Sequence, residues 1–164
     1  MKFSICISAL NLSFNLIKEI PNDIKQLTKL TSLNLGNLPL AEFPSVIKDL
    51  KNLEIFFYGG NGLSQFPQEI IELTKLKLLN LGSNEIEEIP DNIDQLKYLD
   101  SLHLYYNKLK RIPSGLCNLK NLRLLNLDNN LIHFIPDEIV NLRKLETLNL
   151  ESNKLAEFKK EITS

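Results

Sequence analysis

The chain lacks the residues on which several classes of small protein depend. Among its 164 residues are two cysteines, one methionine, six glycines and no tryptophan. Cys6 and Cys117 are too few for a disulfide framework, and neither has the Cys/His spacing of a zinc site. No apolar run approaches the roughly 18 residues that a membrane-spanning helix requires. The sequence therefore predicts no disulfide scaffold, no metal, no cofactor and no membrane span.

Neither sign of charge dominates the chain. Nineteen basic residues stand against twenty acidic ones, which leaves a net charge of -1. Non-specific nucleic-acid binding needs a strong field of Lys and Arg to displace counterions, so nucleic acid is not the expected partner. Hydrophobic residues make up 43% and charged residues 24% of the chain, which is typical of a soluble globular protein and excludes a disordered one.

Leucine and asparagine are the abundant residues, and they recur with a fixed period. The chain has 34 Leu and 19 Asn, about a third of all residues, and such a bias indicates an internal repeat. Six of the seven prolines are spaced 23 residues apart: Pro21, Pro44, Pro67, Pro90, Pro113 and Pro136. Seven repeat units begin in the same phase at Ile7, Leu30, Leu53, Leu76, Leu99, Leu122 and Leu145.

The apolar pattern inside one unit carries a family resemblance. The fourth unit reads Leu76, Leu79, Leu81, Asn84, Ile86, Ile89, Pro90, Ile93, Leu96. The pattern resembles the leucine-rich repeat family in its 23-residue form, and the near-identical units are similar to those of bacterial members, spirochaete ones among them. The resemblance covers residues 7 to about 162. It implies an α/β fold, a right-handed solenoid (horseshoe) of about seven repeats, with parallel strands on the concave face and short helices on the convex face.

Elementary geometry favours the same arrangement. The Leu-x-Leu alternation sends both leucines to one face of a short strand. The apolar residues after each proline are three apart, which suits a turn or two of helix with proline at its first position. Each unit can bury its apolar side only against its neighbours. We therefore divide the chain into an N-terminal extension or partial cap, residues 1–6, and a leucine-rich repeat domain, residues 7–164.

A column of asparagines is expected inside the coil. Asn15, Asn61, Asn84, Asn107, Asn130 and Asn153 share one repeat position, where a buried amide can satisfy backbone groups of adjacent coils. The second unit departs, because Leu38 stands in the slot and Asn37 precedes it. Either the apolar residue fills the slot, or a shift of one residue brings Asn37 into it. In both cases the local hydrogen bonding should be the weakest here.

The two ends leave the compartment and the assembly open. The segment after Lys2 faintly resembles the start of a secretory signal, although its leucine phase favours a first strand. A cytoplasmic protein is the simplest interpretation, and a secreted or cell-surface protein follows if a signal peptide has been removed. At the other end Lys159 replaces the proline, and residues 160–164 are mostly polar. The ends of a solenoid need to be covered. We therefore expect this segment to be a minimal cap, to be followed by missing sequence, or to self-associate.

No catalytic constellation is visible. His103 and His133 are 30 residues apart and out of register, and the chain has no GxSxG, HExxH, P-loop or GxGxxG motif. The glycine cluster of Gly59, Gly60 and Gly62 falls at the end of the third strand, where turn residues are expected. The sequence therefore predicts a protein that is not an enzyme.

The concave face is the expected binding surface, and one column across it stands out. It runs Asn11, Asn34, Phe57, Asn80, His103, Asn126, Asn149. Five asparagines set a norm within the chain, which Phe57 and His103 break. Asn80 lies between them, and Tyr105 should lie beside His103. Aromatic anchors ringed by polar groups are typical of binding hot spots, although scattered exposed aromatics are also common on neutral surfaces.

We predict a protein-binding site on the concave face, with its cluster on units three to six. Its residues are Ile55, Phe57, Leu78, Asn80, His103, Tyr105, Leu124, Asn126, Asp128 and Glu151. Gly36, Gly59 and Gly82 should leave room there for a partner's side chain. Asp128, Glu146 and Glu151 should make the C-terminal part of the face acidic, against Lys77 and Arg123, and attract a basic segment of the partner.

The expected function is a scaffold that recognises a protein partner of unknown identity. The resemblance implies that such bacterial proteins can be exported and contact host molecules. Two alternatives remain at this point. The chain could be the recognition part of a larger effector enzyme whose catalytic domain lies beyond Ser164, or a structural element that self-associates end to end.

Overall fold

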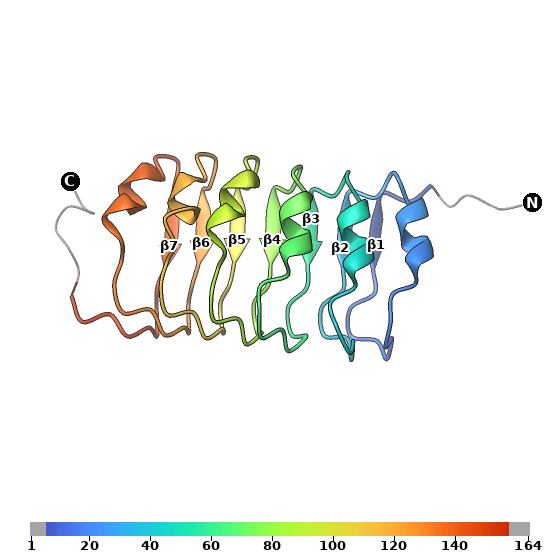
Figure 1. The fold of residues 1–164 in the computed structure, drawn as a ribbon, viewed down its shortest axis with the longest axis horizontal. Helices are drawn as coiled ribbons and strands as arrows, with labels where there is room; N and C mark the ends of the chain where they lie inside the picture. Colours follow the sequence, from blue (N-terminus) through green and yellow to red (C-terminus); the bar gives the residue numbers. More distant parts are fainter. Residues whose placement is uncertain (1–5, 158–164) are drawn as a thin grey trace, which may run out of the picture.

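The computed structural model describes residues 6–157, which form a stack of coils with one parallel sheet. Seven strands lie side by side in sequence order, each paired in parallel with the next (Figure 1). The strands are β1 (Ala9–Asn11), β2 (Ser32–Asn34), β3 (Ile55–Phe57), β4 (Leu78–Asn80), β5 (Ser101–His103), β6 (Leu124–Asn126) and β7 (Thr147–Asn149). Equivalent residues of successive units pair directly, as Leu33 does with Phe56. The predicted right-handed solenoid is confirmed, while the departure at Lys159 and the segment after it lie outside the described residues.

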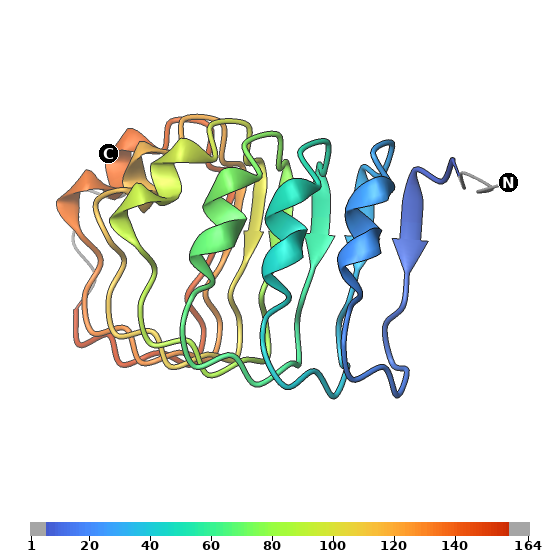
Figure 2. The ribbon, with the colours of Figure 1, turned by 45° about the vertical axis from the view of Figure 1, so that its right-hand side comes forward.

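Short 3-10 helices cover the face opposite the sheet (Figure 2). They are η1 (Asn22–Gln26), η2 (Ser45–Asp49), η3 (Gln68–Glu72), η4 (Asp91–Gln95), η5 (Leu116–Asn118) and η6 (Asp137–Asn141). The prediction that proline is the first helical residue was wrong by one position. Pro21 and Pro90 have extended ψ angles of 147° and 146° and precede the helix as its cap. The fixed φ of proline suits this position equally well.

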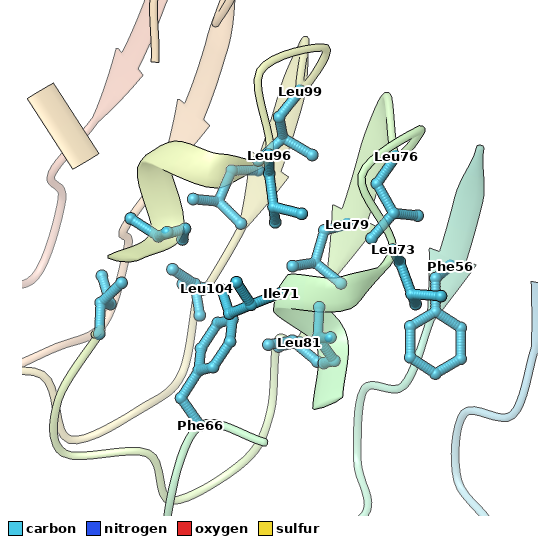
Figure 3. Packing of buried hydrophobic residues seen from close by; sticks show 14 of the residues in the cluster. Phe56, Phe66, Ile71, Leu73, Leu76, Leu79, Leu81, Leu96, Leu99 and Leu104 are labelled. Carbon is cyan, nitrogen blue, oxygen red and sulfur yellow. The ribbon is translucent and has the colours of Figure 1, made fainter. Parts of the chain in front are cut away.

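The core is a column of aliphatic side chains between the strands and the 3-10 helices. Leu79 and Leu81 of the fourth coil are fully buried, and both point into this space (Figure 3). Leu102 and Leu104 repeat the arrangement one coil further on. The apolar side of each coil is thus covered by its neighbours, as the nearest-neighbour stability of a solenoid requires.

The asparagine ladder is present and links neighbouring coils. The amide nitrogen of Asn84 donates to the carbonyl oxygen of Tyr58 in the preceding coil and to that of Leu81 in its own, at 3.1 and 3.0 Å. Its Oδ1 accepts from the backbone N–H groups of Asn61 and Leu63. Asn107, Asn130 and Asn153 repeat the pattern. These ladder residues are therefore structural, as predicted. The prediction was wrong for Asn15, which is exposed and donates only within its own coil.

Leu38 itself fills the ladder position of the second coil. It is 4% exposed, and its backbone N–H donates to Oδ1 of Asn61 at 2.8 Å. The alternative role of Asn37 is wrong, because Asn37 has a φ of 54° and is exposed. That residue occupies the left-handed turn after the strand, as Gly60 does in the next coil with a φ of 72°. A leucine side chain makes no hydrogen bond, so the first two coils are not joined by a ladder side chain at this position.

An aromatic cluster replaces aliphatic packing in the second and third coils. Phe56 and Tyr58 are 0% and 1% exposed, and their ring centroids are 5.8 Å apart. Phe43 packs on Tyr58 at 5.0 Å. Burial raises the pKa of Tyr58 to about 12, because a phenolate would lose its hydration in this environment.

The raised pKa of Tyr58 predicts a loss of stability at alkaline pH. An unfolded tyrosine ionises near pH 10, so above that pH the unfolded state loses its proton first and stability falls towards pH 12. The expected loss is about 2–3 kcal/mol. Urea unfolding across this pH range should show a steeper decline for the wild type than for Tyr58→Phe. Tyr98→Phe, at an exposed position, is the control and should behave as the wild type; parallel curves for Tyr58→Phe and the wild type would refute the prediction.

Candidate functional site

The first and third residues of each strand point away from the core and form the concave face. In β3, Phe56 is buried, while Ile55 and Phe57 on either side are half-buried. Nine of the ten predicted site residues are half-buried and Glu151 is exposed. The register brings Phe57, Asn80 and His103 together on consecutive strands. Glu151, after β7, lies four coils from Phe57 and does not belong to the same cluster.

The asparagines of this face have a structural role that sequence analysis missed. Oδ1 of Asn80 accepts from the backbone N–H of Gly82 at 2.9 Å, and Oδ1 of Asn126 accepts from that of Asp128 at 3.0 Å. Asn11, Asn34 and Asn149 make the same bond to the residue two positions on. Such local side-chain to backbone bonds stabilise the turn that ends each strand. Asn80 and Asn126 are therefore explained without a partner.

Phe57 and His103 stand at the two positions of this column that lack the side-chain bond to the backbone N–H two residues on. Phe57 has no polar atom, and in the described part of the chain no hydrogen bond joins the His103 side chain to the backbone N–H of Tyr105. The local turn geometry thus gives no reason for either side chain. Burial lowers the pKa of His103, so its imidazole is neutral at pH 7 and can act as one donor and one acceptor.

Tyr105 leans over the neighbouring coil. A Cβ placed on Gly82 would overlap the Tyr105 ring, and the amide of Asn80 lies 3.5 Å from the Tyr105 hydroxyl oxygen. The expectation that Gly82 leaves room for a partner is therefore wrong, because Tyr105 fills that space. The Tyr105 ring also meets the His103 ring edge-on, with centroids 6.4 Å apart. The result is a continuous surface running from Asn80 to His103 and Tyr105.

One carboxylate oxygen on this face accepts no hydrogen bond. Oδ1 of Asp128 is shielded from solvent and has no partner within residues 6–157. A shielded acceptor without a partner costs about 1–3 kcal/mol.

Glu146 was expected to attract a basic segment of a partner, but its carboxylate is paired within the protein. Its Oε1 accepts from Nε and Nη2 of Arg123, at 2.9 and 2.6 Å. Lys77 is engaged as well, at 2.7 Å from Glu54. The two charges within each pair compensate each other. The acidic character of the C-terminal part of the face therefore comes from Asp128 and Glu151.

A hollow at the beginning of the strands was not predicted. Its volume is about 930 Å³, and its lining includes Ile55, Leu78, Tyr98, Arg143 and Lys144. The turns that provide Tyr98, Arg143 and Lys144 precede β5 and β7. The lysines of these turns recur in the sequence, but only the fold shows that the turns meet along one edge.

The described residues contain neither a metal-ligand cluster nor a membrane-spanning helix. Residues 6–157 hold no group of three or more His, Cys, Asp or Glu side chains that could coordinate a metal ion. No helix in that range is long and apolar enough to cross a bilayer. Cys6 is exposed and Cys117 is buried, and both are free. The burial raises the pKa of Cys117 to about 11, which makes its thiol unreactive at neutral pH.

The coils define a parallel-stranded solenoid with an open, mixed polar and aromatic face. A family profile described as "Leucine-rich repeat region" matches residues 64–164, which is more than half of the chain. The protein belongs to the leucine-rich repeat family. No curated protein matches the sequence significantly.

Several solved structures share the fold. A leucine-rich repeat protein of Leptospira interrogans is 40% identical over 95% of this chain, with a TM-score of 0.90. The ectodomain of the Arabidopsis thaliana receptor kinase GASSHO1/SCHENGEN3, solved in complex with CASPARIAN STRIP INTEGRITY FACTOR 2, is 29% identical over 95% of the chain, with a TM-score of 0.82. An internalin of Listeria monocytogenes is 30% identical over 89% of the chain, with a TM-score of 0.73. The chain spans 40%, 20% and 40% of these three proteins, respectively.

Proposed function

We propose that this protein binds a protein partner through the concave cluster, defined here as Phe57, His103, Tyr105 and Asp128. The observation that carries the proposal is the pair of exceptions in the asparagine column. Five strands use asparagine to stabilise the turn that follows, whereas β3 and β5 give up that bond for Phe57 and His103. Side chains that local stability does not explain are candidates for binding.

The chemistry of the cluster suits a protein surface. Phe57 and Tyr105 offer half-buried rings that can lose their remaining hydration on contact, as anchor residues do. His103 and Asp128 place a half-buried imidazole and a half-buried carboxylate beside them, and a carboxylate binds a partner's cation through charge-assisted hydrogen bonds. Ile55, Leu78 and Leu124 add apolar area, and Asn80, Asn126 and Glu151 form the polar surroundings.

We also propose that the partner is a host protein met outside the bacterial cell. Similarity to bacterial proteins of Leptospira and Listeria supports this proposal, as does similarity to a receptor ectodomain solved with its protein ligand.

Affinity capture with matched variants tests the proposal. Immobilised wild type should retain a protein from host extract that the quadruple alanine variant of the concave cluster does not retain. Phe134→Ala/Val140→Ala, which removes two exposed apolar side chains outside the cluster, should capture that protein as well as the wild type. Retention by all three proteins would refute the concave site, and retention from the bacterium's own extract alone would refute the host partner. Melting curves establish that each variant is folded.

A further inference from the structure

A basic edge runs along the turns that precede the strands. Six two-residue turns lead into β2 to β7, on the upper side of the ribbon in Figure 2. Seven of these twelve residues are cationic and none is acidic: Lys29, Lys51, Lys75, Lys97, Lys120, Arg143 and Lys144. A chain with a net charge of -1 therefore concentrates seven of its nineteen cations on one edge. Charge segregation of this kind steers the association of an oppositely charged ligand.

Ion pairs compensate little of the positive charge on this edge. Lys51, in the turn before β3, pairs with Glu72 of the next coil at 2.9 Å. The corresponding residues before the later turns are Gln95, Asn118 and Asn141, which are neutral. In the described part of the chain, the other six cations of the edge belong to none of the five ion pairs: Lys29, Lys75, Lys97, Lys120, Arg143 and Lys144.

The hollow at the beginning of the strands lies between this edge and the concave face. One row across it alternates in sign, and most of that row is neutralised internally: Glu54, Lys77, Asp100, Arg123 and Glu146. Lys77 pairs with Glu54 and Arg123 with Glu146. The Asp100 carboxylate accepts from the Ser101 hydroxyl at 3.0 Å, a neutral group that does not compensate its charge. The remaining cations of the lining are Arg143 and Lys144. Lys144 donates only to a neutral amide oxygen, that of Asn121, at 2.8 Å.

The opposite end of the hollow adds apolar side chains beside the Glu54–Lys77 pair. Ile55 and Leu78 line it together with Tyr98, whose side chain is 63% exposed. The lining extends from the coil of β3 to that of β7, which is roughly 19 Å at about 4.8 Å per strand. An extended peptide of about six residues has that length.

We propose that this hollow binds an extended acidic segment of a protein partner. Apolar side chains of the segment lie on Ile55 and Leu78, and its carboxylates bind Arg143 and Lys144 through charge-assisted hydrogen bonds. The inference rests on the proposed function in one respect, that the occupant is part of a protein. A sulfated polysaccharide would match the basic edge but would leave the apolar end of the hollow without a complementary group.

Selection from a library of random linear peptides tests this inference. Immobilised wild type should enrich peptides that carry both carboxylates and large aliphatic residues. An individual enriched peptide should bind about tenfold more weakly to Arg143→Ala/Lys144→Ala, and its affinity should fall with added salt. Lys108→Ala/Lys110→Ala removes the same number of charges elsewhere, from the pairs with Glu85 and Glu87, and should bind as the wild type does.

The other outcomes overturn the inference. An enriched pool without acidic residues, or one that binds equally well to Arg143→Ala/Lys144→Ala, would exclude the acidic segment. Binding of a sulfated polysaccharide that depends on Arg143 and Lys144, with no acidic peptide enriched, would replace the peptide by a glycan. Peptides that depend on Phe57 and Tyr105 but not on Arg143 and Lys144 would overturn this inference while leaving the proposed function intact.

Discussion

Replacing Asn107 by leucine is expected to lower the free energy of unfolding by about 3 kcal/mol or more. Asn107 is 8% exposed, and its amide nitrogen donates to the carbonyl oxygens of Leu81 and Leu104, both at 3.0 Å. Its Oδ1 accepts from the backbone N–H of Ile86 at 2.9 Å. Leucine satisfies none of these three backbone groups, and each buried group left without a partner costs about 1–3 kcal/mol. Urea unfolding followed by circular dichroism measures the loss.

Asn15 provides the matched control for this substitution. It holds the same repeat position in the first coil, but it is exposed and donates only within its own coil, to the carbonyl oxygens of Leu12 and Ser13. Water can replace those bonds, so Asn15→Leu should cost roughly 1 kcal/mol or less. Equal losses for the two variants would mean that the ladder does not join the coils energetically.

Leu81→Ala is expected to cost about 2–5 kcal/mol. The side chain is fully buried in the middle of the stack, among leucines and isoleucines of the same and adjacent coils (Figure 3). Deleting it removes apolar area and leaves a cavity that rigid neighbouring coils cannot close. Each coil depends on its neighbours, so the loss should appear as a lower midpoint for the whole unfolding transition.

Leu78→Ala is the control in the same coil. Leu78 is three residues before Leu81 and half-buried on the concave face. Its truncation should cost about 1 kcal/mol of stability, because part of the side chain is already hydrated. Phe57→Ala with Tyr105→Ala should likewise remain folded and lose partner binding. A midpoint for Leu78→Ala as low as that for Leu81→Ala would mean that the core and the concave face are assigned wrongly.

The periodic features of the molecule could be predicted from its sequence. A spacing of 23 residues fixes which leucines are buried, and Leu79 and Leu81 are fully buried as their alternation predicts. The same phase places Asn84, Asn107 and Asn130 inside the coil, where all three are buried. Periodicity defines a face without any knowledge of side-chain contacts, so all ten predicted site residues also lie on the concave side.

The contacts between coils could not be predicted in the same way. The sequence left open whether Leu38 or Asn37 occupies the ladder position of the second coil. The left-handed backbone conformation of Asn37 shows that Leu38 does. Whether Gly82 offers space depends on the direction of the Tyr105 ring, which sequence spacing leaves open. The bond from Arg123 to Glu146 joins residues 23 positions apart, and either charge alone looks available in the sequence. Side-chain direction and pairing depend on the packed neighbours rather than on the local pattern.

Oxidative footprinting of the protein with and without its captured partner tests the central claim most directly. Hydroxyl radicals modify aromatic side chains according to their exposure, so protection reports where the partner lies. We predict that Phe57, His103 and Tyr105 are protected in the complex, while Phe134 is modified equally in both states. Protection of Phe134 together with unchanged modification of the concave cluster would contradict the account.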